Sequence, residues 1–151
     1  MRKIWLFFAS DFQSKKLLIE AYILLAWGRV LKALPFRKIS PLLGSKMIET
    51  SFEIEAANIK KVKQISHAIH IMSSYTTWES MCLVKAIAAM KMLERRKIDC
   101  TLYLGTAKDE NGGMIAHAWL RSGPFYITGA EEMKKFVVVY TFAKKVEAYN
   151  K

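Results

Sequence analysis

The sequence predicts an α+β domain, in which helices cover one face of an antiparallel sheet. Apolar residues recur at helical spacing in the first two thirds of the chain, whereas residues 100–142 form four short apolar segments bounded by turn residues. Helices followed by consecutive strands are typical of this fold class. With 151 residues, 52% of them hydrophobic, the chain is long and apolar enough for one domain with its own core.

The first predicted helix covers residues 17–34 and ends at Pro35. Its apolar run is about the length of a membrane span, but three charged residues interrupt it: Glu20, Arg29 and Lys32. Charges at such positions are costly in lipid. We therefore expect an amphipathic helix that packs on the domain or on a partner, or that makes peripheral contact with a membrane surface. The stretch that follows, LPFRKISPLLGS, is predicted to be a turn-rich link.

Two further helices precede the strands. Apolar residues from Ile54 to Met72 fall on one face at helical spacing. The segment from about Glu79 to Arg96 is apolar apart from a narrow polar stripe, so we expect it to be the central helix on the sheet. Strands are predicted at residues 100–107, 114–121, 124–129 and 135–142, with a hairpin at Ser122-Gly123.

Cys82 lies near the start of the central helix, where a thiol feels the unpaired amides and the positive end of the helix dipole. Two sequence patterns predict different starts for this helix. Thr76 and Glu79 form a capping-box pattern that would leave Cys82 more than a turn inside the helix. Ser80 as the N-cap would instead put Cys82 in the first turn, where thiolate is favoured.

His117 is the one histidine in a predicted strand, so a helix-start cysteine and a mid-strand histidine can meet as a thiol–imidazole pair. The alternative is a core histidine hydrogen-bonded to backbone. His67 and His70 are spaced for a metal, but no carboxylate or thiol is placed to complete a site, so no metal or cofactor is expected. Cys100, at a strand start, is interpreted as a core residue.

The formal net charge of +11 indicates a binding partner such as nucleic acid, an anionic membrane or an acidic peptide. No DNA- or RNA-binding motif accompanies it, so nucleic acid is not the expected partner. Two cysteines and the absence of a complete signal peptide favour a reducing bacterial cytoplasm.

Trp78, Ser80, Cys82 and Leu83 spell W-x-S-x-C-L, and a helix, LYLG and HAWLR follow. From about Leu17 to Phe142 the chain resembles the transglutaminase-like cysteine peptidases of lasso-peptide biosynthesis, which remove the leader from a ribosomally made precursor. The resemblance implies a papain- or transglutaminase-like fold, in which Cys82 attacks the carbonyl at the end of the leader. His117 would take the thiol proton and later protonate the leaving amine.

The resemblance also implies partners: the lasso precursor peptide, a small winged-helix protein that binds the leader, and an ATP-dependent lasso cyclase that closes the ring afterwards. Residues 1–50 are then a helical, partner-docking segment and residues 51–151 the peptidase domain. The competing function is a non-catalytic module of the same fold that binds a peptide or partner.

Gly129 stands where many members of that family carry an aspartate as the third catalytic residue. We expect Thr128 to replace it, because an adjacent hairpin strand would place it opposite His117; Glu131, Glu132 and a backbone carbonyl are the alternatives. Trp78 and Trp119 are interpreted as core residues, or as walls of the substrate groove.

Overall fold

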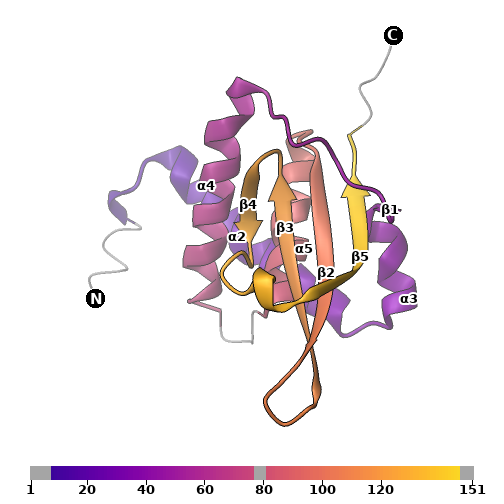
Figure 1. Cartoon of the computed structure of the whole chain (residues 1–151). Coiled ribbons are helices and arrows are strands. Elements are labelled where there is room, and N and C mark those ends of the chain that lie inside the picture. The colour runs from indigo at the N-terminus through magenta and orange to yellow at the C-terminus, as the bar shows by residue number, and fades with distance from the viewer. Residues whose placement is uncertain (1–7, 77–80, 147–151) are drawn as a thin grey trace.

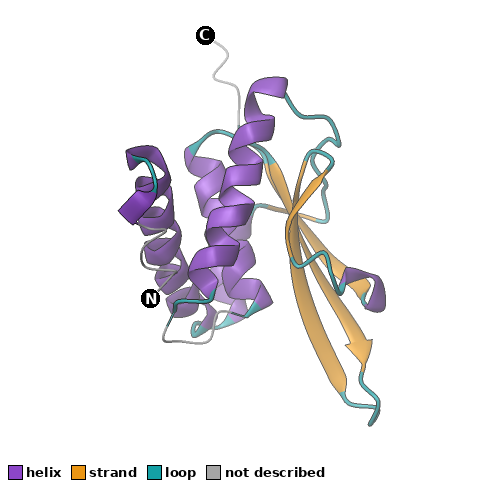
Figure 2. Ribbon diagram, turned by 90° about the vertical axis from the view of Figure 1, so that its left-hand side faces the viewer, coloured by secondary structure: helices purple, strands orange, loops and turns teal. Residues whose placement is uncertain are grey.

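The computed structural model describes residues 8–76 and 81–146, and these form a helical layer packed on one face of an antiparallel sheet (Figures 1 and 2). The helices are α2 (Phe12–Lys32), α3 (Phe36–Ile39), α4 (Ala56–Ser73) and α5 (Cys82–Arg95), with short 3-10 turns η1 (Ser40–Leu43) and η2 (Met133–Lys135). The strands are β1 (Ser45–Lys46), β2 (Cys100–Lys108), β3 (Met114–Ser122), β4 (Phe125–Thr128) and β5 (Val137–Lys144). The five strands lie in the order β1-β5-β2-β3-β4. The predicted α+β class is therefore confirmed.

The helix bounds differ most from the prediction at the N-terminal ends. α2 begins at Phe12, five residues before the predicted start at residue 17, with Asp11 as its N-cap. Residues 34–45, predicted to be a turn-rich link, instead form α3 and η1, and Pro41 fits the first turn of the 3-10 helix because its missing N–H needs no partner there. No helix in the described part of the chain is both long and apolar enough to cross a membrane.

The sheet follows the predicted strands closely. Ser122 pairs with Phe125 across the predicted hairpin, and Gly123 takes the positive φ of 55° that its turn requires. β5 returns to the other edge of β2, where Leu102 pairs with Phe142. The sheet is thus antiparallel throughout, with β2 at its centre.

A single core joins the helices to the sheet. It contains Leu25 of α2, Ile65 of α4, Ile87 of α5 and Leu120 of β3, all fully buried. Burying such aliphatic side chains contributes roughly 1.5–3 kcal/mol each. Since α2 shares this core with the rest of the chain, the helical segment before residue 50 packs as part of the fold; its role in docking a partner stays a prediction.

Candidate active site

Cys82 is the first residue of α5. The N-cap is Met81, which has an extended backbone with φ −71° and ψ 170°, and its carbonyl accepts the first helical hydrogen bond, from the Lys85 amide at 3.0 Å. The capping-box start from Thr76 is wrong: Thr76 donates its hydroxyl proton to the Ser73 carbonyl at 3.0 Å, at the end of α4. Glu79 and Ser80 lie outside the described residues. Of the two helix starts left open by the sequence, the structure agrees with the one that puts Cys82 in the first turn, with Met81 rather than Ser80 as the N-cap.

This position gives the thiol a polar environment. The amides of Cys82, Leu83 and Val84 have no carbonyl within the helix to bond, because they belong to its first turn. They stand at the positive end of the helix dipole, where an anion is stabilised. The side chain of Cys82 is half-buried and also packs on the core.

The imidazole of His117 lies on the face of β3 away from the helices. Ala118 and Leu120 belong to the core beneath the helices, so alternation places His117 and Trp119 on the opposite face. The imidazole is stacked between Phe136, with ring centroids 5.0 Å apart, and Trp119, at 5.8 Å. These contacts hold the ring in one orientation.

Gly105 makes room for this aromatic stack. It pairs with His117 across β2 and β3. A Cβ at residue 105 would lie 2.9 Å from both the Phe136 Cβ and the Trp119 ring, closer than such atoms approach in proteins. Gly105 and Phe136 are not among the residues predicted from the sequence, although a lone glycine inside a predicted strand is a signal of close approach by another group.

The His117 Nε2 lies 2.8 Å from the carbonyl oxygen of Gly129. A carbonyl oxygen only accepts hydrogen bonds, so Nε2 is the donor, and in a neutral ring Nδ1 is then the nitrogen that can accept a proton. Gly129 has φ 76°, and a Cβ there would lie 2.5 Å from the Ala118 carbonyl oxygen. The backbone carbonyl of Gly129 therefore orients the imidazole, at the position where the resemblance led us to look for an aspartate. A backbone carbonyl was one of the alternatives considered from the sequence.

The register that favoured Thr128 is wrong. Thr128 pairs with Leu120, three residues along β3 from His117. Without the bulge between Leu120 and Arg121, the hairpin register would pair Thr128 with Trp119, so His117 is not its partner in either case. Its Oγ1 is buried and has no hydrogen-bond partner in the described structure. Glu131 and Glu132 are exposed, and neither forms a hydrogen bond with His117 in the described part of the chain.

Cys82 and His117 line the same cleft, which has a volume of about 700 Å³. β4 stops at Thr128, so among the described residues the edge of β3 beside His117 is unpaired, and the imidazole reaches the cleft there. The opposite wall is α4, which contributes His70. Within the described residues no hydrogen bond joins Cys82 to His117. Catalytic pairs are often longer before substrate binds and shorten in the substrate complex.

Two other residues singled out from the sequence, Trp119 and Cys100, do not line this cleft. Trp119 is 4% exposed and stacks on Tyr103 with ring centroids 5.6 Å apart, so it packs in the interior and is not a groove wall. Trp78 lies outside the described residues. Cys100 is fully buried at the start of β2, as expected of a core residue, and burial raises the pKa of its thiol to about 12. No group of three or more His, Cys, Asp and Glu in the described part of the chain is placed to hold a metal ion.

Comparison with known proteins identifies the family. A model described as the transglutaminase-like superfamily matches residues 24–141, well over half of the chain, and the match spans Cys82, His117 and Gly129. No curated protein and no solved structure matches the chain significantly. The helical layer, the antiparallel sheet and this match agree: the chain belongs to the transglutaminase-like superfamily, which includes cysteine peptidases.

Proposed function

We propose that the chain is a cysteine peptidase that removes the leader from a lasso-peptide precursor before cyclisation. The observation that carries this proposal is the shared cleft: a cysteine at the N-terminus of a helix and a histidine whose Nε2 is held by a backbone carbonyl line the same cleft. Membership of the transglutaminase-like superfamily supports the peptidase chemistry. The leader substrate rests on the W-x-S-x-C-L and HAW motifs alone.

The reaction follows from the positions of these groups. The Cys82 sulfur attacks the scissile carbonyl carbon while Nδ1 of His117 takes the thiol proton. The first-turn amides of α5, that of Cys82 included, donate hydrogen bonds to the oxyanion. The C–N bond then breaks, His117 returns its proton to the leaving amine, and water hydrolyses the acyl-enzyme. The Gly129 carbonyl stabilises the imidazolium that forms between these steps.

Proposed partners follow from the same resemblance. A winged-helix leader-binding protein presents the precursor, and an ATP-dependent cyclase takes the freed amine. Such a peptidase works in the cytoplasm, where the precursor is made.

Replacement of Cys82 tests the proposal. In a cleavage assay with precursor and leader-binding protein, Cys82→Ala should lower kcat/KM by about three orders of magnitude or more. Cys100→Ala is the matched control, since Cys100 is fully buried and does not line the cleft, and it should cleave at nearly the wild-type rate. Cleavage by Cys82→Ala at the wild-type rate would show that the proposal is wrong.

The second candidate is a binding module without catalysis. It is favoured by the missing hydrogen bond between Cys82 and His117 in the described structure and by a glycine at the family's aspartate position. It predicts that the wild-type chain binds the precursor without cleaving it. It also predicts that the double variant Cys82→Ala, His117→Ala binds the precursor with unchanged affinity.

A further inference from the structure

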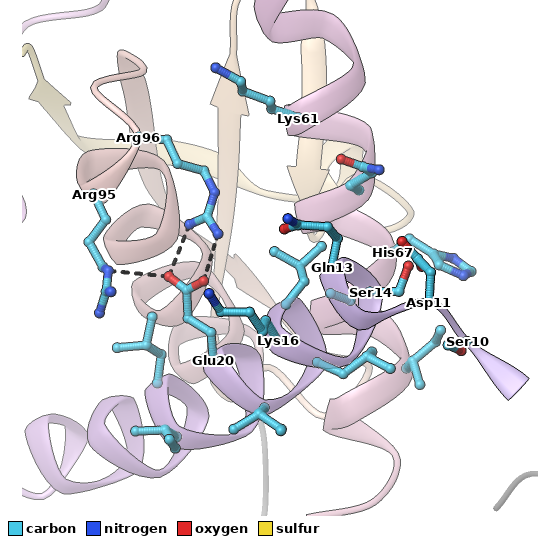
Figure 3. A pocket seen from close by; sticks show the side chains of 18 residues that line it. Ser10, Asp11, Gln13, Ser14, Lys16, Glu20, Lys61, His67, Arg95 and Arg96 are labelled. Atoms are coloured by element: carbon cyan, nitrogen blue, oxygen red, sulfur yellow. Dashed lines mark hydrogen bonds and ion pairs between the residues drawn. The ribbon is translucent and has the colours of Figure 1, made fainter. Parts of the chain in front are cut away.

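A second groove, which we call the α2–α4 groove, lies away from Cys82. It has a volume of about 750 Å³ and is lined by α2 from Gln13 to Leu24, by α4, and by Arg95 and Arg96 at the end of α5 (Figure 3). α4 separates it from the catalytic cleft, and His67 borders both. The proposed peptidase chemistry makes no use of this groove.

The groove has an apolar floor and an apolar lip. Leu24 of α2 and Ala68 of α4 are buried along the floor. Ile19 and Ile23, one turn apart on α2, line the groove and remain 51% and 59% exposed. Neighbouring aliphatic side chains left this exposed on a helix are typical of a surface that a partner covers.

Basic side chains dominate the groove. Four of them line it, Lys16, Lys61, Arg95 and Arg96, against two acidic residues, Asp11 and Glu20. Figure 3 shows both arginines directed at the one carboxylate of Glu20.

Arg96 makes the closest contacts with the Glu20 carboxylate. It binds both carboxylate oxygens of Glu20, at 2.9 and 2.6 Å. Arg95 makes only a 3.3 Å contact with the same carboxylate, and its side chain remains 61% exposed. One carboxylate is thus shared by two arginines, and neither Lys16 nor Lys61 forms an ion pair in the described structure, so the groove keeps an excess of positive charge for an incoming anionic group.

We propose that the α2–α4 groove binds an acidic, amphipathic helical segment of another polypeptide. Its α2 wall, Gln13 to Leu24, is about 17 Å long at 1.5 Å per residue, which suits three turns of a helix. An apolar stripe on that segment covers Ile19 and Ile23, and flanking carboxylates meet the basic side chains, as in helix-in-groove recognition. A lipid surface fits less well, because the cations line a concave groove between two helices.

Designed peptides test the proposal independently of catalysis. The probe is a fluorescein-labelled peptide of about 18 residues, with leucines along one helical stripe and glutamates beside it. One control peptide carries lysines in place of the glutamates, and another has the same composition in an order without a stripe. Binding to the full chain is measured by fluorescence anisotropy, and vesicles of anionic phospholipid are tested by co-sedimentation.

The acidic striped peptide should bind, and both controls should bind at least about tenfold more weakly. Lys16→Glu with Lys61→Glu should raise its Kd by about tenfold or more, whereas Lys108→Glu, an exposed lysine on the sheet, should not. Ile23→Ser should weaken binding, and Val137→Ser, at a position that is 72% exposed on β5, should not.

Three results overturn the proposal. The first is a Kd weaker than about 1 mM for the acidic striped peptide. The second is equal binding by the unstriped peptide or by the groove variants, which indicates attraction to overall charge. The third is vesicle binding that Lys16→Glu with Lys61→Glu abolishes while peptide binding is absent, which identifies the groove face as a membrane contact. Loss of peptidase activity has no bearing on these measurements.

Discussion

The two cysteines of the chain lie near opposite ends of α5 and in opposite environments. Cys82 begins the helix, is half-buried and lines the cleft that holds His117. Cys100 follows the C-terminal end of the helix and is sealed in the core, where burial, and next the carboxylate of Asp99, raise the pKa of its thiol to about 12. One end of α5 places its cysteine in a cleft beside a histidine, and the other end closes its cysteine off from solvent. Placement around the helix, rather than residue type, therefore determines which thiol a substrate can reach.

The largest effect is expected from a comparison of two of the three histidines that line the cleft, His117 and His70. His117 is held by the Gly129 carbonyl and the aromatic stack, whereas His70 lines the same cleft from α4 with an exposed side chain. His117→Ala should reduce kcat by about 10²–10⁴, the usual contribution of a general base.

His70→Ala is the matched control and should leave kcat within about threefold. Cleavage kinetics of the two variants measure the difference. A large loss in His70→Ala with little loss in His117→Ala would assign the base to the α4 wall of the cleft.

A smaller effect on kcat is expected from replacing Gly105, which has no side chain to crowd Phe136 and Trp119. In Gly105→Ala the new Cβ must displace Phe136 or the Trp119 ring, and the imidazole stacked between them moves as well. Misplacing a catalytic group by about 1 Å costs up to 10²-fold in rate, so kcat should fall by about one to two orders of magnitude with KM less affected.

Phe136→Leu removes the same stack without crowding and should lower kcat by less than Gly105→Ala. Its control is Phe36→Leu, which removes an aromatic contact with Phe142 on the other side of the sheet. Equal kcat values for the two leucine variants would contradict a positioning role for the stack.

The smallest effects are expected from two buried threonines: the hydroxyl of Thr101 is hydrogen-bonded, and that of Thr128 has no partner in the described structure. Thr101 accepts a hydrogen bond from the Thr50 amide at 2.9 Å and shares another with the Thr50 hydroxyl, so Thr101→Val should lower the free energy of unfolding by about 1–3 kcal/mol. The Thr128 hydroxyl has no partner in the described structure, so Thr128→Val should change that free energy by less than about 0.5 kcal/mol. Urea unfolding measures both, and equal losses would contradict the assigned contacts.

The spacing of apolar residues in the sequence was sufficient to predict that the long helices exist. Apolar spacing predicted α4 to within two residues at each end, because one face of that helix is buried against the core. The start of α5 was harder, since its N-cap is Met81, which makes no side-chain cap, while polar residues upstream suggested two earlier starts. The elements between residues 34 and 46 are short and depend on tertiary packing rather than on periodicity.

Of the candidate site, only the side chains of Cys82 and His117 were predictable. Cys82 and His117 carry motifs, but the group that orients the imidazole is a backbone carbonyl, which leaves no side-chain signature in a sequence. Thr128 was favoured on an assumed strand register, but in the hairpin that begins at Ser122 and Phe125 it pairs with Leu120, three residues from His117.

The most direct test of the reactive end of α5 is alkylation of the native chain with iodoacetamide near neutral pH, followed by mass spectrometry of the two cysteine peptides. Cys82 should be labelled well before Cys100, because the buried Cys100 thiol, with its pKa raised to about 12, stays protonated and shielded. His117→Ala should slow labelling of Cys82 and leave Cys100 unchanged. Equal labelling of the two cysteines, or a Cys82 rate that does not depend on His117, would contradict a thiol–imidazole pair in this cleft.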